Sequence, residues 1–400
     1  MKPTIHGDGP WREEALPPND FETENVMADA SLYEAVGLGL GKSEMYGVML
    51  ALKKLGEDPM KKLATVRFFG KMLGTGGDYF VFETTLSAPE AAEEAELAAG
   101  EVPAEPSGSG ANLYTYFVCS YIGGAFTRLP DVTPGMITAA RPIKHYLTGD
   151  LSAEVCPYPP FPGQEAAFLR AQVGRIASAT VVCPGGFFTL GEDGGRARQI
   201  RRCPPHHRPP TRILNPRVLN QTAGYDAASD VWQALDGGLA KAEEFVAMAA
   251  EEMAELGKWG HRYAHIKQQG RCELYVPPPA EGEEEAPPSE DVSPALLSGL
   301  DADAESSSAD WGSATAGEPA WATCTSSSIP GVKFQVVGVK SLVWPGAFVV
   351  YSAGAFSNCY VGYGFKNAPF VPAPPPAVMV EYEGVLQAGC SSTTHRGYPT

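Results

Sequence analysis

The clearest hydrophobic pattern in the chain lies between residues 164 and 176. Leu169, Val173 and Ile176 recur at helical spacing, and Phe168 stands beside them. Residues spaced in this way share one face of an α-helix. The pattern therefore predicts an amphipathic helix whose apolar face packs into the core.

The residues around this pattern favour a helix that starts after residue 163. The prolines of residues 157–162 hold the preceding chain extended, and Glu165 places a negative charge in the first turn, where the helix dipole favours it. Arg170 and Arg175 flank the apolar face. We expect both guanidinium groups at the exposed edge of the helix, available to a partner.

Helical spacing recurs in three further segments. Two helices between residues 21 and 55 are joined by a glycine elbow at 37–41. Thr133 is a predicted N-cap followed by proline at the first helical position, and Pro142 predicts an early break or a kink. A long helix is expected from residue 227 to about residue 256.

Alternating and aromatic runs separated by glycines predict strands. Residues 66–74 and 78–83 form a predicted hairpin, and in the second run Phe80 and Phe82 face one way while Tyr79 and Val81 face the other. Such a strand is covered on both sides. Further strand patterns at 113–119, 126–129 and 332–364 complete a predicted α+β fold, an antiparallel sheet packed with helices and interrupted by long disordered loops.

Composition sets the expected domain limits. The 400 residues include 36 prolines and 44 glycines, concentrated in polar stretches too poor in large apolar groups to offset the entropy of ordering. We expect a disordered N-terminus (1–20), one domain (21–376) and a flexible tail (377–400). Disordered loops are predicted at about 87–110, 192–224 and 277–320.

Charge and cysteine content narrow the classes of function. A formal net charge of −17 disfavours nucleic-acid binding, which needs clustered Lys and Arg. The N-terminus lacks an apolar signal region and no run of about 18 apolar residues occurs, so we expect neither secretion nor a membrane span. Eight scattered cysteines without a Cys-x-x-Cys motif favour reduced thiols in the cytoplasm.

Three motifs invite a chemical interpretation, and each is weak. The glycines before Lys42 and Ser43 suggest a phosphate-binding loop, but Val36 stands where that loop needs glycine and the flank is helical. Cys203 with His206 and His207 lacks a second pair of zinc ligands. Seven arginines between residues 196 and 217 lack the interleaved aromatic residues of a nucleic-acid surface. We predict no cofactor and no metal.

His261 and His265 leave an alternative open. They are spaced four residues apart near Trp259, but they do not form the His-Glu-x-x-His motif of a metalloprotease. The alternative to a structural protein is a soluble cytosolic enzyme of unknown reaction that uses these histidines or a cysteine.

The order of motifs along the chain resembles one known family. Residues 158–176 read Tyr-Pro-Pro-Phe-Pro-Gly-Gln-Glu-Ala-Ala-Phe-Leu-Arg-Ala-Gln-Val-Gly-Arg-Ile and look like the signature block of the radial spoke head protein 4/6 family. Further stretches resemble the family in the same order: residues 36–41, 67–74, 78–83, 116–119, 128–134, 269–272, 341–347, 360–364 and 366–369. Trp344 lies in one of them, and with residues 168–170, 173, 175 and 176 it is a predicted core or interface residue.

The resemblance implies a non-enzymatic subunit of the radial spoke head in the axoneme of cilia and flagella. It also implies partners, namely a paralogous or identical head subunit in a dimer, radial spoke head protein 9, MORN-repeat head subunits and the central pair apparatus. Contact with the central pair would inform the dynein arms and so regulate motility. Nucleic acid and membrane are not expected partners.

Overall fold

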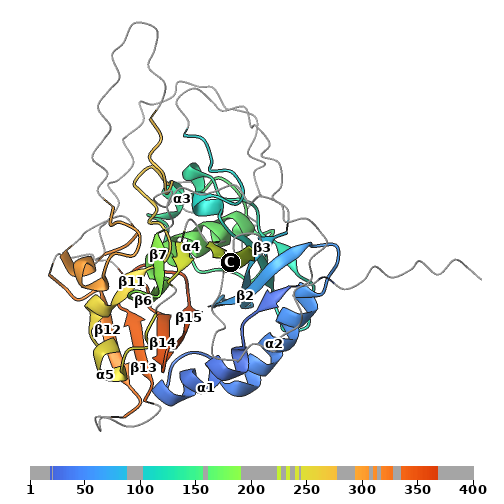
Figure 1. Cartoon of the computed structure of the whole chain (residues 1–400). Coiled ribbons are helices and arrows are strands. Elements are labelled where there is room, and N and C mark those ends of the chain that lie inside the picture. The colour runs from blue at the N-terminus through green and yellow to red at the C-terminus, as the bar shows by residue number, and fades with distance from the viewer. Residues whose placement is uncertain are drawn as a thin grey trace, which may run out of the picture. The chain divides into compact units, whose positions relative to one another are not determined.

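A mixed β-sheet of nine strands runs through the centre of the fold (Figure 1). The structure is a computed structural model in which all of the described residues belong to the first of two units, residues 1–368. It describes residues 19, 21–87, 102–155, 161–190, 223–226, 231–234, 239–242, 245–276, 293–305, 310–312, 317–327 and 335–367.

The sheet joins two antiparallel groups of strands that come from opposite ends of the chain. The first group is β2 (Leu63–Met72), β3 (Tyr79–Leu86), β4 (Thr115–Cys119) and β5 (Thr127–Arg128). The second group is β12 (Trp321–Thr325), β13 (Val337–Ser341), β14 (Ala347–Ser352) and β15 (Ala355–Gly362). Strands β15 and β2 pair in parallel, and β1 (Glu22–Thr23) also pairs in parallel with β2. The predicted α+β class is confirmed, with parallel pairs that the sequence did not reveal.

A glycine permits the junction between the two groups. Gly70 aligns with Tyr360 beside a register shift in β2, and its φ of 155° is one that other residues rarely adopt. A Cβ atom at this position would lie 2.0 Å from the carbonyl oxygen of Tyr360. Glycine therefore lets the two backbones approach at the parallel pair.

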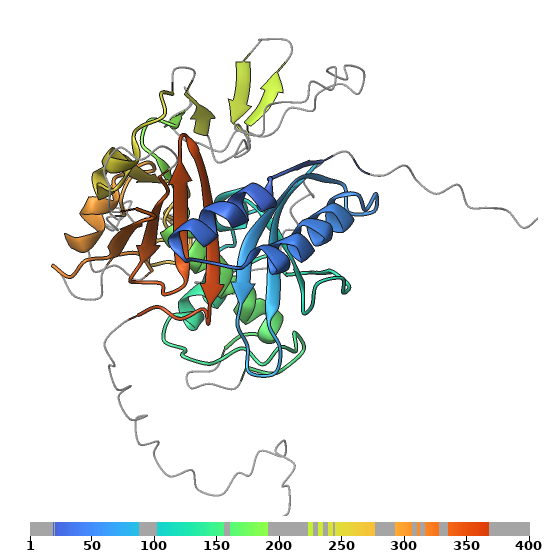
Figure 2. The same ribbon diagram turned by 90° about the horizontal axis from the view of Figure 1, so that it is seen from below.

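Helices cover both faces of the sheet (Figure 2). Helices α1 (Val26–Val36) and α2 (Lys42–Gly56) lie on one face, and Gly37 in the left-handed conformation ends α1 as the predicted glycine elbow. Helices α3 (Pro134–Ala140) and α4 (Glu165–Thr180) lie on the other face. The Thr133 hydroxyl accepts a hydrogen bond from the N–H of Met136, so the predicted N-cap of α3 is confirmed.

The two-sided covering of β3 is also confirmed. Phe80 and Phe82 belong to the core cluster beneath α1 and α2, whereas Tyr79 and Val81 belong to the cluster beneath α4. Alternate side chains of a strand point to opposite faces, so β3 contributes to both cores.

Smaller elements lie around this frame. They are η1 (Gly110–Asn112), β6 (Val182–Pro184), β7 (Phe188–Leu190), β8 (Ala223–Asp226), β9 (Val231–Ala234), β10 (Leu239–Lys241), α5 (Ala250–Met253), η2 (Leu256–Lys258), β11 (Trp259–His261) and η3 (Leu300–Glu305). The predicted long helix from residue 227 to about 256 is wrong. Its described part holds β9, β10 and the single turn of α5, because β10 pairs with β7 and β9 with β8. Cross-strand pairing overrides the helical spacing there.

Acidic residues fix parts of two predicted loops in place. Glu105 and Asp310 are 6% and 0% exposed, although they lie in the ranges 87–110 and 277–320 for which we predicted disorder. The prediction is wrong for the described residues of these ranges, because their carboxylates form buried hydrogen bonds. The predicted disorder of residues 88–101, 192–222, 277–292 and 377–400 concerns residues that lie outside the described part of the chain.

Substitution of Leu169 or Ile176 by alanine tests the packing of α4. Both side chains are 0% exposed, so each substitution should lower the free energy of unfolding by roughly 2–5 kcal/mol. Chemical denaturation monitored by circular dichroism measures this change. Leu50→Ala, at a side chain that is 48% exposed on α2, is the control and should change stability by less than about 0.5 kcal/mol. Equal effects at the three positions would contradict the packing described.

Candidate functional site

Helix α4 is buried on all sides, including its charged residues. Fifteen of its sixteen residues are buried, so the apolar stripe predicted from the sequence is only part of what packs. The candidate core or interface residues are all buried at 0–3% exposure: Phe168, Leu169, Arg170, Val173, Arg175, Ile176 and Trp344. The expectation that Arg170 and Arg175 lie at an exposed edge is therefore wrong.

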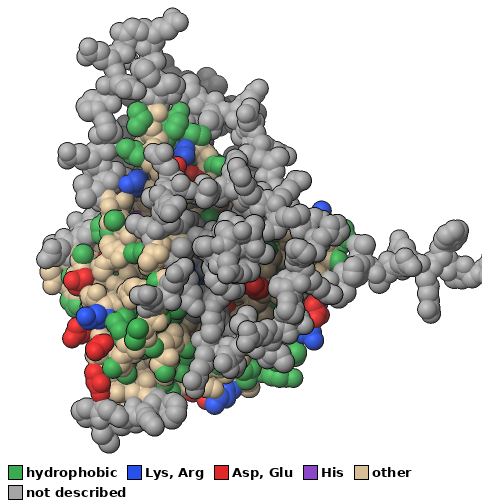
Figure 3. Space-filling view, viewed as in Figure 1, with side chains coloured by type: hydrophobic (Ala, Val, Ile, Leu, Met, Phe, Trp, Pro, Cys, Tyr) green, Lys and Arg blue, Asp and Glu red, His purple; other side chains and the backbone are tan. Residues whose placement is uncertain are grey.

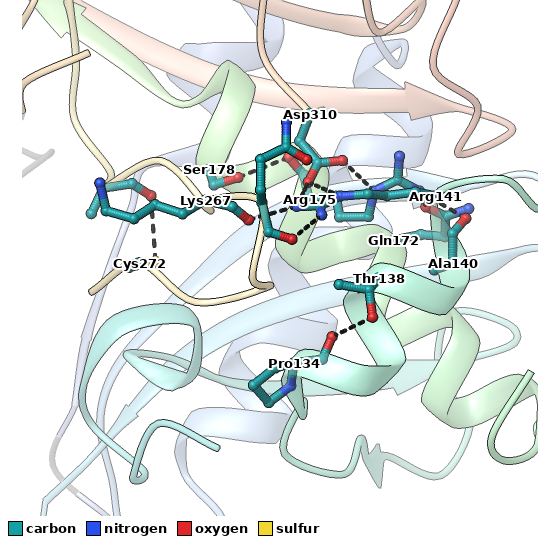
Figure 4. Close-up of polar contacts among 12 residues, drawn as sticks. Pro134, Thr138, Ala140, Arg141, Gln172, Arg175, Ser178, Lys267, Cys272 and Asp310 are labelled. Carbon is teal, nitrogen blue, oxygen red and sulfur yellow. Dashed lines mark hydrogen bonds and ion pairs between the residues drawn. The ribbon is translucent and has the colours of Figure 1, made fainter. Parts of the chain in front are cut away.

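Arg175 and Arg141 bind one buried carboxylate, that of Asp310 (Figure 4). Arg175 Nε donates to Asp310 Oδ1 at 2.6 Å, and Arg141 donates to Oδ2 through Nε at 3.0 Å and Nη2 at 2.8 Å. Burial alone would raise the pKa of Asp310, but the two guanidinium groups hold it below its usual value. The carboxylate is therefore ionised, and it links α3, α4 and residues 310–312.

Further donors of this cluster also have hydrogen-bond partners. Arg175 Nη1 donates to the carbonyl oxygen of Ala140 and to Gln172 Oε1, and the indole of Trp344 donates to the carbonyl oxygen of Asp310. Arg141 donates to the carbonyl oxygens of residues 267 and 268. The guanidinium carbon of Arg175 lies 5.1 Å from the centroid of the Trp344 ring, within cation–π range. Residues far apart in the sequence thus meet around one charge.

Arg170 is held without a carboxylate in the described part of the chain. Its Nη2 donates to the carbonyl oxygen of Ala111 at 2.7 Å and to Asn112 Oδ1 at 3.2 Å, and its guanidinium carbon lies 4.7 Å from the Tyr116 ring centroid. Burial lowers the pKa of Arg170, against the attraction of Tyr116 and Asp131. This arginine fixes η1 against α4 through dipoles and an aromatic face.

A carboxylate anchors the start of α4. Glu165 is 1% exposed and accepts hydrogen bonds from Tyr79 Oη at 2.7 Å, from the N–H and hydroxyl of Thr148, and from the N–H of Gly149. A negative charge in the first turn suits the helix dipole, as the sequence predicted, and here it also binds the loop before the helix.

A second buried ion pair joins the neighbouring strands β2 and β3, and Tyr263 is hydrogen-bonded to both of its members. Arg67 donates to Glu83 at 2.8–2.9 Å, and Glu83 also accepts from Tyr116 and Tyr263. Tyr116 also packs against the guanidinium group of Arg170, so it contacts both Arg170 and the Arg67–Glu83 ion pair. The arrangement fixes elements in place and positions no nucleophile next to a base.

The histidines are adjacent, but they lie inside the fold. His261 and His265 are 0% and 3% exposed with ring centroids 4.4 Å apart, and His261 Nε2 bonds both carboxylate oxygens of Asp303 at 2.9–3.0 Å. Burial lowers the pKa of His265 well below its usual value, so this ring is neutral at physiological pH. His261 ends strand β11. Because both rings are buried, a substrate in solution cannot reach them.

The cysteines are equally poor candidates for catalysis. Burial raises the pKa of Cys119 to about 11 and those of Cys183 and Cys359 to about 12, which keeps the thiols protonated. Cys119 is buried in the core. Among the described residues, no group of three or more His, Cys, Asp or Glu side chains is placed to hold a metal ion. Cys203, His206 and His207, like the seven arginines, lie outside them.

Neither a phosphate-binding loop nor a membrane span is found in the described residues. The glycines before Lys42 connect helix α1 to helix α2, whereas a phosphate-binding loop connects a strand to a helix. None of the helices in the described ranges is long and apolar enough to cross a bilayer.

In the described residues, buried charged groups hold helices, strands and loops together. Comparison with known proteins identifies the family. The family model of the radial spokehead-like proteins matches residues 8–101 and 87–389, so the chain belongs to that family. It is 39% identical to flagellar radial spoke protein 4 of Chlamydomonas reinhardtii over 92% of this chain and 72% of that protein.

Two human relatives are more distant and longer. Radial spoke head protein 6 homolog A of Homo sapiens is 32% identical over 95% of this chain and 54% of its own length. Radial spoke head protein 4 homolog A of Homo sapiens is 32% identical over 92% of this chain and 50% of its own length. The chain thus spans about half the length of these two proteins. The family resemblance, which residues 158–176 and the other motifs carry, is confirmed.

Replacement of Asp310 by asparagine tests the charge cluster. The substitution leaves two guanidinium groups without their anion, so the free energy of unfolding should fall by roughly 3–5 kcal/mol. Asp301→Asn, at an exposed carboxylate of the same segment, is the matched control and should change it by less than about 0.5 kcal/mol. Urea denaturation compares the two variants. An Asp310 variant as stable as the control would show that the cluster is dispensable.

The buried carboxyl group of Glu24 should make the free energy of unfolding fall as the pH rises. Its carboxylate lies 3.9 Å from Arg67 Nε, and burial raises its pKa from 4.5 to about 8, with Arg67 opposing the shift. The folded protein therefore holds a proton that the unfolded chain releases. The resulting stabilisation is complete below pH 4.5 and is lost as the pH rises through about 8.

Glu24→Gln removes this titration. Across that pH range the stability of the variant relative to the wild type should rise by up to about 1.4 kcal/mol per pH unit, as measured by chemical denaturation. Glu34→Gln is the control: hydrogen bonds from Lys42 lower the pKa of Glu34 from 4.5, so Glu34 does not titrate in this range and the curve of its variant should run parallel to that of the wild type. Parallel curves for wild type and Glu24→Gln would show that Glu24 titrates normally.

Proposed function

We propose that this chain is a non-enzymatic structural subunit of the radial spoke head in the axoneme of motile cilia and flagella. The observation that carries the proposal is the family match across residues 8–389, with relatives that are named as radial spoke proteins. The chain works in the cytoplasm as part of the cytoskeleton. It helps the head to contact the central pair apparatus and so regulates dynein-driven motility.

The partners follow from the same role. A paralogous or identical head subunit forms a dimer with this chain, and radial spoke head protein 9 and MORN-repeat subunits complete the head. The central pair apparatus meets the assembled surface. Neither nucleic acid nor membrane belongs to this set of partners.

The packing of charge supports a mechanical role. A subunit that passes force from one surface to another needs elements that do not slide, and α4 is joined to its surroundings by Glu165, Arg170 and Arg175. Buried hydrogen-bonded charges such as those of Glu165 and Arg175 rigidify a core. The enzyme alternative has little support, since His261 and His265 are enclosed and His261 is bonded to Asp303.

Expression of the tagged chain tests the proposal in a flagellated cell that lacks its own relative of radial spoke protein 4. The tag should sediment with the axonemes after detergent extraction, and swimming should recover. The unfolding-prone Asp310→Asn variant should do both less well, while Asp301→Asn should match the wild type. A tag that stays in the detergent-soluble fraction while the remaining spokes assemble would contradict the proposed function.

A further inference from the structure

Exposed apolar side chains are concentrated around α2. Of the eight most exposed large hydrophobic side chains among the described residues, four lie on this helix, the turn after it and the loop between β4 and β5: Tyr46, Leu50, Met60 and Tyr121. They are 53%, 48%, 75% and 68% exposed. Figure 3 shows green apolar side chains at the lower right of the molecule, where α2 lies, with blue basic and red acidic side chains beside them.

The loop between β4 and β5 is fixed against α2. A Cβ atom on Gly47 would lie 2.9 Å from Ile122 Cδ1, so the glycine makes room for this side chain in the middle of the helix. Lys54 Nζ donates to the carbonyl oxygens of Gly123 and Gly124 at 3.0 and 3.2 Å. The loop therefore follows the stripe of residues 47, 50 and 54, which share a helical face.

These contacts build a defined surface, which we call the α2 ridge: Tyr46, Leu50 and Tyr121. Glycine inside a helix costs about 1 kcal/mol relative to alanine, and at Gly47 that cost accompanies the docking of the loop. Tyrosine supplies a large, rigid contact area with a polar end, which is why it is common at protein interfaces. The opposite face of α2 is already used, since Met45, Val48, Leu52 and Leu55 are buried.

Two lysines lie next to the ridge, in a chain of net charge −17. Lys53 and Lys54 follow Leu50, and the carboxylate nearest to Lys53, that of Glu57, lies 3.9 Å away. Lys54 donates to the two carbonyl oxygens of the loop and lies 5.8 Å from the centroid of the Phe126 ring. The acidic side chain of α2, Glu44, is bound by Lys71 at 2.8 Å. The ridge thus offers positive charge beside apolar side chains.

We propose that the α2 ridge binds an acidic segment of another spoke-head subunit, whose apolar side chains cover Tyr46 and Leu50 and whose carboxylates pair with Lys53 and Lys54. The inference rests on the proposed function, since it names one kind of partner within the head. Charge complementarity favours an acidic segment over a basic one, and the exposed tyrosines favour a protein segment over a small anion.

Photo-crosslinking from position 50 tests the proposal on the full chain. p-Benzoylphenylalanine replaces Leu50 in one variant and Tyr363, which is 49% exposed elsewhere, in the control. Both are expressed in the flagellated cell and irradiated in the axonemal and soluble fractions, and mass spectrometry reads the crosslinked peptide. We expect a peptide rich in Asp and Glu from another subunit, at about tenfold higher yield from position 50 than from position 363.

Reversal of the basic charges supplies the second readout. Lys53→Glu with Lys54→Glu should lower the crosslinking yield at position 50 by about tenfold. Crosslinking to a second copy of this chain, to a peptide without acidic residues, or at no more than the control yield would overturn the proposal. Sedimentation with axonemes is scored on the same samples. A chain that carries the crosslinker at position 50 and both native lysines, and that assembles without the crosslink, overturns the ridge alone, whereas failure of that chain to assemble overturns the proposed function.

Discussion

The burial of two guanidinium groups on α4 is the constraint on which the rest of the fold depends. A helix that presents apolar side chains on every side can be enclosed at little cost, but Arg170 and Arg175 cannot be enclosed without partners. Their partners lie far away in the sequence. Asp310, which binds Arg175, lies 135 residues after it, and Ala111 and Asn112, which bind Arg170, lie in the segment before β4. The parts of the chain that supply these partners are thereby fixed in the native fold.

This requirement explains which features could be predicted from the sequence. Local periodicity predicted α4, the N-cap at Thr133 and the two-sided strand β3, because each is determined by neighbours in sequence. Asp310 could not be found in this way, since it lies in a polar segment whose composition indicates a solvated loop. The only signal was indirect: two arginines beside an apolar stripe require either an exposed edge or a buried anion, and we expected the edge.

Long-range pairing explains the remaining differences. The parallel junction of β15 with β2 joins residues almost 300 positions apart, and no local pattern distinguishes it from an antiparallel pair. Helical spacing between residues 227 and 256 was misleading for the same reason, since strand pairing decides the conformation of the described residues there. The family resemblance was more informative than periodicity, because the order of motifs records the whole fold at once.

A subunit built in this way is suited to transmit contact forces. In the described interior, Asp310 is paired with two arginines and the thiols of Cys119, Cys183 and Cys359 are protonated. These buried groups favour rigidity. The side chains of the α2 ridge are exposed on the surface, next to Lys53 and Lys54. The interior holds the shape, and the ridge is the surface that we propose for binding.

A double-mutant cycle between Arg175 and Asp310 tests the central claim most directly. Arg175→Met, Asp310→Leu and the double variant are compared with the wild type by urea denaturation. If the pair holds α4 as described, the double variant loses less stability than the sum of the losses of the two single variants, and the difference, the coupling energy, is at least about 2 kcal/mol. A coupling energy near zero would show that the two side chains are neighbours without consequence, and the account would fail.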